Sequence, residues 1–225
     1  MRSGSLPARV RVSAPVIVYI GGRDDLDLLI ALREPKVHVD YPPQPGQRVD
    51  EVLTLCGPVR FSYRLSKPEL LTYIRGLEVY ANIIARSAFS LAALRLCIGG
   101  LTSISEAVQA SKDIGSEALA YALSLGGAVL SRRSASGGWL FIGRWQLPGD
   151  TKVVISYGAH QQETVNVIEV LSRILNRMAD NGDVCSCSEA RLGLNIKVSL
   201  RESYESALLV TRFDNRGAEI EVHQD

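Results

Sequence analysis

The amino-acid sequence predicts an α/β or α+β fold, with one mixed β-sheet packed against a central apolar helix and flanking helices. Two observations lead to this prediction. Short β-branched runs interleave with stretches of helical periodicity, without any repeat period. Of the 225 residues, 46% are hydrophobic, which is enough to bury a core. Because no stretch has the composition of a linker, we predict a single compact domain over residues 1–225, in which residues 1–14 could form a flexible N-terminal arm.

The first elements are predicted to be a strand and a short helix. Residues 15–20 form a β-branched run that ends at a Gly-Gly pair, a pattern typical of a buried strand. Asp24 or Asp25 can then cap a helix over residues 25–34, which would end before a proline.

A strand, a loop and a hairpin are predicted next. Residues 36–41 alternate between apolar and polar side chains like a strand, and the proline-rich stretch 42–47 is the clearest loop in the chain. Residues 49–55 and 59–64 can pair as a hairpin around the turn at residues 56–58.

Helical periodicity dominates residues 68–125. Glu78, Asn82 and Arg86 recur at i, i+4 and i+8 and form one polar stripe on an otherwise apolar helix. Such a helix should be central rather than superficial. Residues 103–106 form a capping box that starts another helix.

The last part of the chain returns to mixed structure. Helices are predicted over residues 116–124 and 167–178, and strands over residues 139–146, 152–157, 194–200, 206–213 and 218–222. The turn residues 214–217 predict that the last two strands pair as a hairpin.

Composition narrows the class of protein. The 25 basic and 24 acidic residues exclude a uniformly cationic nucleic-acid coat, so any nucleic-acid contact needs a local patch. No segment approaches the ~20 uninterrupted apolar residues of a membrane span, and the N-terminus lacks the apolar centre of a secretion signal. We therefore expect a cytoplasmic protein without a membrane partner.

Arginine is strongly preferred over lysine, with 20 arginines among the 25 basic residues. GC-rich coding or a thermophilic host would explain the bias, and phosphate recognition is the functional alternative. The four cysteines, Cys56, Cys97, Cys185 and Cys187, are expected to be free thiols in a cytosol, except that hyperthermophiles do form intracellular disulfides. The sequence leaves their pairing open.

Sequence motifs give no positive case for an enzyme. Residues 21–25 form a strand-to-helix turn that matches neither a dinucleotide fingerprint nor a Walker A loop. His160, with Glu163 nearby, has no partner at a catalytic spacing, and Cys185 and Cys187 lack the further ligands of a zinc site. We therefore assign no catalytic residue, no metal and no cofactor.

One stretch stands out as a candidate binding surface. Residues 118–149 contain no acidic side chain, yet they hold arginines and aromatic residues on both sides of a flexible loop at residues 134–138. Arginines can contact phosphates while aromatic faces stack on unpaired bases. The alternative is that the aromatic residues belong to the core of a strand and the arginines are merely solvated.

The order of elements resembles the kinase-binding subunit of the KEOPS complex, the archaeal and eukaryotic machinery for threonylcarbamoyladenosine in tRNA. The resemblance is carried by a strand and acidic turn at residues 16–32, Val-His-Val-Asp at 37–40, Gly-Leu-Glu at 76–78, Glu-x-Leu-x-Tyr at 117–121, and the strand 196–200 followed by Glu202 and Glu205.

This resemblance implies a non-catalytic subunit that binds tRNA and the protein kinase subunit of the same complex. The residues that would bind nucleic acid are Arg132, Arg133, Arg144, Lys152, Trp139 and Trp145. Tyr121 and Leu125 would contact the kinase.

Two other functions stay open. An enzyme of unrecognised family could use Asp24, Asp25 and Asp27 to hold a metal at the end of the first strand. A structural subunit could bury apolar helix surface in an oligomer.

Overall fold

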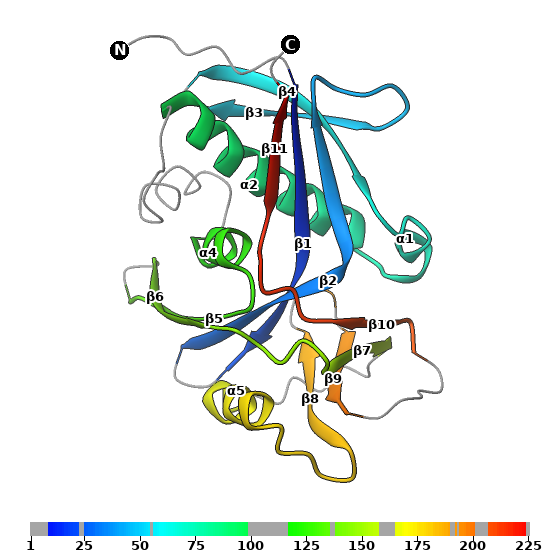
Figure 1. The fold of residues 1–225 in the computed structure, drawn as a ribbon, viewed down its shortest axis with the longest axis vertical. Coiled ribbons are helices and arrows are strands. Elements are labelled where there is room, and N and C mark those ends of the chain that lie inside the picture. The colour runs from blue at the N-terminus through cyan, green and yellow to red at the C-terminus, as the bar shows by residue number, and fades with distance from the viewer. Residues whose placement is uncertain are drawn as a thin grey trace.

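The structure is a computed structural model that describes residues 9–22, 25–54, 56–98, 117–135, 138–157, 165–189, 192, 194–200 and 207–223. Its strands are β1 (Arg9–Gly21), β2 (Leu26–Tyr41), β3 (Arg48–Thr54), β4 (Gly57–Leu65), β5 (Ala128–Arg133), β6 (Trp139–Trp145), β7 (Lys152–Tyr157), β8 (Asp183–Glu189), β9 (Leu194–Ser199), β10 (Leu209–Arg212) and β11 (Glu219–His223). Its helices are α1 (Leu70–Tyr73), α2 (Leu77–Ile98), α4 (Glu117–Leu125) and α5 (Val167–Asn176). The α+β class is confirmed (Figure 1).

The strands form two antiparallel sheets where the sequence predicted one mixed sheet. The larger sheet has seven strands, with the path β11-β1-β2-β4-β3 and the hairpin β5-β6 attached to β2. The smaller has the order β10-β7-β9-β8. One end of β2 pairs with β4 and the other with β5, so the long strands β1 and β2 form the spine of the molecule (Figure 1).

The helix predicted over residues 25–34 is wrong, because these residues begin the long strand β2. The run from Leu28 to Leu32 is buried at every position, with each side chain at most 1% exposed. It is covered on both faces, so it lacks the alternation that marks a half-buried strand. A continuous short apolar run cannot be distinguished from a buried helix by periodicity alone.

The predicted hairpin between the last two strands is also wrong. Strand β10 pairs with β7 in the small sheet, whereas β11 pairs with β1 in the large one. The connecting residues bind the turn after α4 instead: the Gly127 amide donates to the Asp214 carbonyl, and the Ala218 amide donates to the Leu123 carbonyl. A Cβ at Gly126 would lie 2.3 Å from the Gly217 nitrogen, so the two backbones touch.

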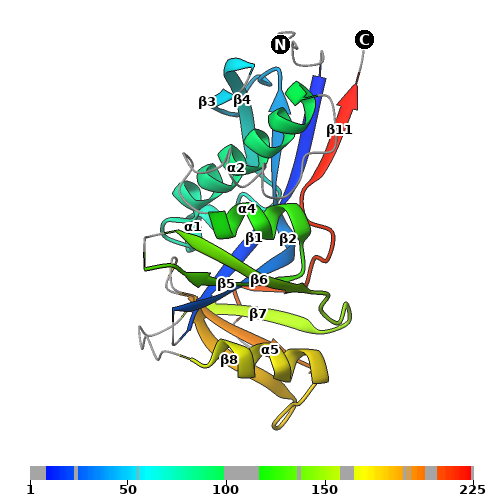
Figure 2. The ribbon, with the colours of Figure 1, turned by 90° about the vertical axis from the view of Figure 1, so that its left-hand side faces the viewer.

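Helix α2 is central, as the sequence predicted, and it packs along one face of the large sheet (Figure 2). Ile84 and Phe89 are at most 1% exposed, and Phe89 stacks on Phe61 with ring centroids 4.8 Å apart. Contrary to expectation, residues 77–97 are long and apolar enough to cross a membrane by length and composition. Because 72% of the most apolar window is buried inside the molecule, α2 serves here as a core helix, which is consistent with a soluble protein.

The polar stripe of α2 fastens the helix to strand β3. Asn82 Nδ2 donates to Asp50 Oδ2 at 2.7 Å, and Arg86 forms an ion pair with the same carboxylate at 3.3 Å. Glu78 pairs with Arg48 one turn earlier. The stripe therefore faces charged partners at the edge of the sheet.

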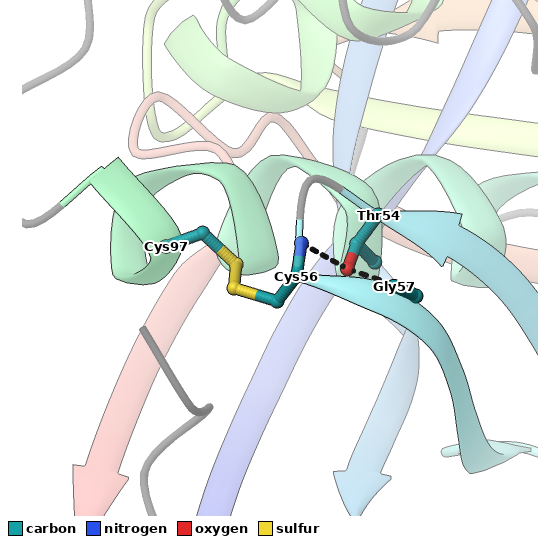
Figure 3. Close-up of a disulfide and its surroundings, with 4 residues drawn as sticks. All are labelled: Thr54, Cys56, Gly57 and Cys97. Atoms are coloured by element: carbon teal, nitrogen blue, oxygen red, sulfur yellow. Dashed lines mark hydrogen bonds between the residues drawn. A yellow bond between two sulfur atoms is a disulfide. The ribbon is translucent and has the colours of Figure 1, made fainter. Parts of the chain in front are cut away.

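A disulfide joins Cys56, in the turn between β3 and β4, to Cys97 near the end of α2 (Figure 3). The Cα atoms lie 6.0 Å apart and 41 residues apart in sequence. The hydroxyl of Thr54 accepts a hydrogen bond from the Cys56 amide at 3.1 Å and donates to the Gly57 carbonyl at 2.8 Å, which orders the turn. Cys185 and Cys187 are free thiols.

The small sheet is joined to the large one through a single hydrophobic core, whose buried members come from both sheets and from α5. A bridge between Gly22 and Val165 connects the end of β1 to the start of α5. A Cβ at Gly22 would lie 2.6 Å from Val167, which explains why glycine occupies this position.

The cap of α5 gives a test of this local structure. The Asn166 side chain accepts hydrogen bonds from the amides of Ile168 and Glu169. We expect Asn166→Ala to lower the free energy of unfolding by about 1 kcal/mol, measured by denaturant titration. Asn176→Ala, at the other end of the same helix, is the control and should change it by less than about 0.5 kcal/mol; equal losses in both variants would contradict the capping role.

Part of the predicted N-terminal arm is a strand, and several other predicted features lie outside the described residues. Residues 9–14, assigned by sequence to a flexible arm, form the first half of β1. Asp24, the capping box at 103–106, His160 and Glu163 lie outside the described residues.

Candidate functional site

A buried carboxylate marks the end of the β1–β2 hairpin. Asp27 is 1% exposed, and two nitrogens of Arg133, from the end of β5, donate to its oxygens at 3.0 and 3.2 Å. The Arg133 amide also donates to the Asp25 carbonyl at 2.8 Å, which holds the end of β5 against the hairpin turn. The bidentate arrangement fixes the guanidinium in one orientation.

Two aromatic residues complete the site. Arg133 Nη2 donates to the Tyr19 hydroxyl at 2.9 Å, and the guanidinium lies 5.3 Å from the centre of the Trp139 ring. Tyr19 meets Trp139 edge to face, with centroids 6.4 Å apart. We call Tyr19, Asp27, Arg133 and Trp139 the Arg133 cluster.

The electrostatics of the cluster fix its protonation states. Burial, followed by the neighbouring Asp27, raises the pKa of Tyr19 well above its ordinary value, so the phenol stays protonated. The hydrogen bonds to Asp27 and then to Tyr19 raise the pKa of Arg133, which remains a permanent cation.

One edge of the guanidinium remains available. The Arg133 side chain is 53% exposed, and its Nη1 makes no hydrogen bond to any residue that the structure describes. A fixed, half-exposed guanidinium beside an aromatic face is suited to hold a phosphate or carboxylate group of a small ligand.

The six residues predicted to bind nucleic acid lie on three strands, β5, β6 and β7. Arg133 and Trp139 lie together in the cluster, while the adjacent Arg132 is exposed. Arg144 and Trp145 lie at the opposite end of the β5–β6 hairpin, where they pair with Val129 and Ala128. Lys152 belongs to the small sheet.

Arg144 has a structural role. Its Nε donates to the Gly126 carbonyl at 3.2 Å, and its Nη2 donates to the Asn215 carbonyl. These bonds tie β6 to the α4–β5 turn and to the loop before β11. Trp145 is half-buried and packs against the core.

The residues predicted to bind a kinase lie on α4. Tyr121 stacks on Phe141 of β6, with centroids 4.8 Å apart, and Leu125 packs against the core. Both side chains are half-buried in this way.

Sequence reasoning missed Tyr19 and the true role of Asp27. The open alternative of a metal enzyme would use Asp24, Asp25 and Asp27, but Asp27 is paired with Arg133. Asp24 lies outside the described residues, among which no group of three potential metal ligands occurs. The available signal was one aspartate within the otherwise apolar run 26–32, which a core tolerates only with a partner.

Apart from the Arg133 cluster, an open groove of about 600 Å³ is lined by residues of β1, β2, β4 and β11. Arg11 pairs there with Asp40 at 3.3 Å and lies opposite Glu221 on β11. His38 lies opposite Arg64, and burial and then the Arg64 charge lower the pKa of His38. Alternating charges in this groove favour no single class of ligand.

No protein-family model matches the sequence, and no curated protein sequence matches it. Solved structures do. A protein described as a homoserine kinase from Listeria monocytogenes is 14% identical, with TM-score 0.59, and the match covers 95% of this chain and 100% of that one. A homoserine kinase from Cytophaga hutchinsonii is 10% identical, with TM-score 0.58, over 96% and 98% of the chains. The mevalonate diphosphate decarboxylase of Staphylococcus aureus is 10% identical, with TM-score 0.52, over 95% and 98%.

The fold is similar to the folds of these two homoserine kinases and of the mevalonate diphosphate decarboxylase. The resemblance to a KEOPS subunit is therefore wrong, and with it the tRNA-modification role, the RNA-binding role and the kinase partner. Of the motifs that carried the resemblance, residues 16–21 and 26–32 lie in β1 and β2, and residues 117–121 lie in α4. Glu202 and Glu205 lie outside the described residues.

Proposed function

We propose that this protein is a cytoplasmic enzyme that acts on a small molecule, with phosphoryl transfer as its reaction class. The observation that carries the proposal is the match to the two homoserine kinase structures, which are of the GHMP type, over nearly the whole of both chains. Both of those proteins are described as kinases of homoserine, a small hydroxylated amino acid. The open alternative of an enzyme thus fits the fold better than a non-catalytic RNA-binding subunit does.

The Arg133 cluster is our proposed site for a phosphate group of the ligand. Arg133 offers the free edge of a guanidinium whose other edge is fixed by Asp27, so little side-chain freedom is lost on binding. Trp139 covers one face of the guanidinium and offers a flat apolar surface. Phosphate recognition by a fixed arginine fork needs no resident metal, and a Mg²⁺ ion would arrive with the nucleotide phosphates.

A second candidate function is small-molecule binding without phosphoryl transfer. It is favoured by the first turn of α2, where Glu78, paired with Arg48, places a carboxylate at the helix end that would otherwise attract phosphate. The sequence also lacks Gly-Lys-Ser/Thr. Binding of a small metabolite without binding of ATP would support this candidate.

Titration calorimetry with MgATP tests the proposed function. We expect the wild-type protein to bind MgATP and Arg133→Lys to weaken binding about tenfold, because lysine keeps the charge but loses the fork. Arg132→Lys is the matched control, one residue away and exposed, and should bind like the wild type.

Circular dichroism on the same samples shows whether each variant is folded. Equal weakening in both lysine variants would contradict a specific role for Arg133. Absence of MgATP binding by the folded wild-type protein would contradict phosphoryl transfer.

A further inference from the structure

A groove of about 650 Å³ runs along the small sheet between α5 and β8. Cys185 lines this groove and is half-buried, whereas Cys187, two residues further along β8, is only 6% exposed. Residues i and i+2 of a strand project from the same face, so the two thiols are neighbours. Cys185 is therefore the member of the pair that borders the groove, and Cys187 is its buried neighbour.

The surroundings of Cys185 favour its thiolate form. Arg173 Nε donates to the Val184 carbonyl at 2.7 Å, which holds the guanidinium beside the adjacent Cys185. A hydrogen bond from the Cys187 thiol, helped by the Val198 amide and the charge of Arg173, lowers the pKa of Cys185 against the effect of burial.

Cys187 is the neutral member of the pair. Its bond to Cys185 and its burial raise its pKa well above the ordinary value. The Ile196 carbonyl, a second acceptor near the Cys187 thiol, lies 3.7 Å from Sγ, so that contact is weak. Cys185 is therefore the thiol of the pair that loses its proton more readily.

The other charged groups around the groove are largely paired. They are Glu169 and Arg173 on α5, Asp180 after it, Asp183 on β8 and Lys197 on β9. Arg173 binds Asp180, and Lys197 binds Asp183, each at 2.5 Å. With three acids against two cations, the groove should admit neutral or cationic reagents more readily than anionic ones.

We propose that Cys185 is a nucleophilic thiolate and the site at which small neutral or cationic disulfides modify this protein. In the reaction, the Cys185 thiolate attacks one sulfur of the disulfide, the original S–S bond breaks, and a mixed disulfide forms. The second half of the reagent leaves as a thiolate, which takes its proton from solvent. Cys187 stays reduced, because the i, i+2 spacing of an extended strand suits a disulfide poorly.

The test uses the full-length protein and the neutral disulfide 4,4′-dithiodipyridine, with release of thiopyridone followed by absorbance between pH 5 and 9. We expect one fast equivalent per chain in the native state, mapped by peptide mass to Cys185, and a second only after unfolding. The midpoint of the rate against pH should lie below about 8.5, the value of an ordinary thiol.

Variants separate the contributions of Cys185 and Arg173 to the rate of this reaction. Cys185→Ser should lose the fast equivalent entirely. Arg173→Gln should slow the reaction below the midpoint by roughly threefold to tenfold, as expected when a neighbouring cation is lost, whereas Arg173→Lys should retain most of the rate.

The proposal is overturned if no equivalent reacts before unfolding, if the label maps to another cysteine, or if the midpoint is that of an ordinary thiol. Peptide mapping of the wild-type protein decides the matter even if Cys185→Ser does not fold. None of these readouts depends on ATP, so the proposed enzymatic function is tested separately.

Discussion

Replacing Arg133 with glutamine is expected to lower the free energy of unfolding by about 3 kcal/mol at neutral pH. The substitution leaves the Asp27 carboxylate, 1% exposed, without its cationic partner inside the sheet. Tyr19 can still donate to that carboxylate but cannot neutralise it. This loss of stability lies near the lower limit for breaking a buried ion pair, because the Arg133 side chain is 53% exposed and water partly screens its charge.

Chemical denaturation of matched variants measures this effect. Arg132→Gln removes the same type of side chain from the next, exposed position, and should change stability by less than about 0.5 kcal/mol. The double variant Arg133→Gln with Asp27→Asn removes both charges and should recover part of the loss. If Arg132→Gln and Arg133→Gln are equally stable, Asp27 does not depend on Arg133.

Removing the Cys56–Cys97 disulfide is expected to cost about 4 kcal/mol, the largest stability effect that we expect from any single bond in the molecule. The bond closes a loop over a sequence separation of 41 residues, so it restricts the unfolded chain substantially. It also ties the β3–β4 turn to the end of α2, the helix at the centre of the core (Figure 3). Cys56→Ser should therefore lower the thermal midpoint strongly.

Thermal unfolding with and without reductant gives the control. Reductant should destabilise the wild-type protein but leave Cys56→Ser unchanged, because the variant has no bond to break. Cys185→Ser should respond to reductant like the wild type, since Cys185 is a free thiol. An unchanged midpoint in reduced wild-type protein would contradict a stabilising disulfide.

Much of the fold could be predicted from local pattern. The Pro-rich loop at residues 42–47, the β3–β4 hairpin and the apolar helix α2 each carry a signal within a short window. The predicted polar stripe through Glu78, Asn82 and Arg86 is the side of α2 that meets Arg48 and Asp50. These features depend on residues that are neighbours in sequence.

The predictions that proved wrong concern segments with pairing partners that are distant in sequence. The run at residues 25–34 is a strand because β1 and β5 pair with residues 26–31 and the core covers them. Strand β5 is distant in sequence, so no local pattern reveals this pairing. The last two strands belong to different sheets, because β10 pairs with β7 and β11 pairs with β1. Turn residues alone could not exclude a hairpin there.

The sequence indicated only some of the residues of the candidate site. The acid-free stretch at residues 118–149 pointed to Arg133 and Trp139, and the structure brings these two together. Their partner Asp27 lies 106 residues from Arg133 in sequence, so no spacing rule could join them. The same stretch also pointed to Arg144, which binds backbone carbonyls and serves the fold.

Transfer of label from [γ-³²P]ATP tests the central claim most directly, with the small-molecule filtrate of a cell extract, to which homoserine is added, as the source of acceptors. If this protein is a small-molecule phosphotransferase, label will appear in compounds that pass the filter, and Arg133→Lys will reduce that transfer far more than Arg132→Lys. Label found only in RNA or protein, or no transfer by folded wild-type protein, would contradict the claim.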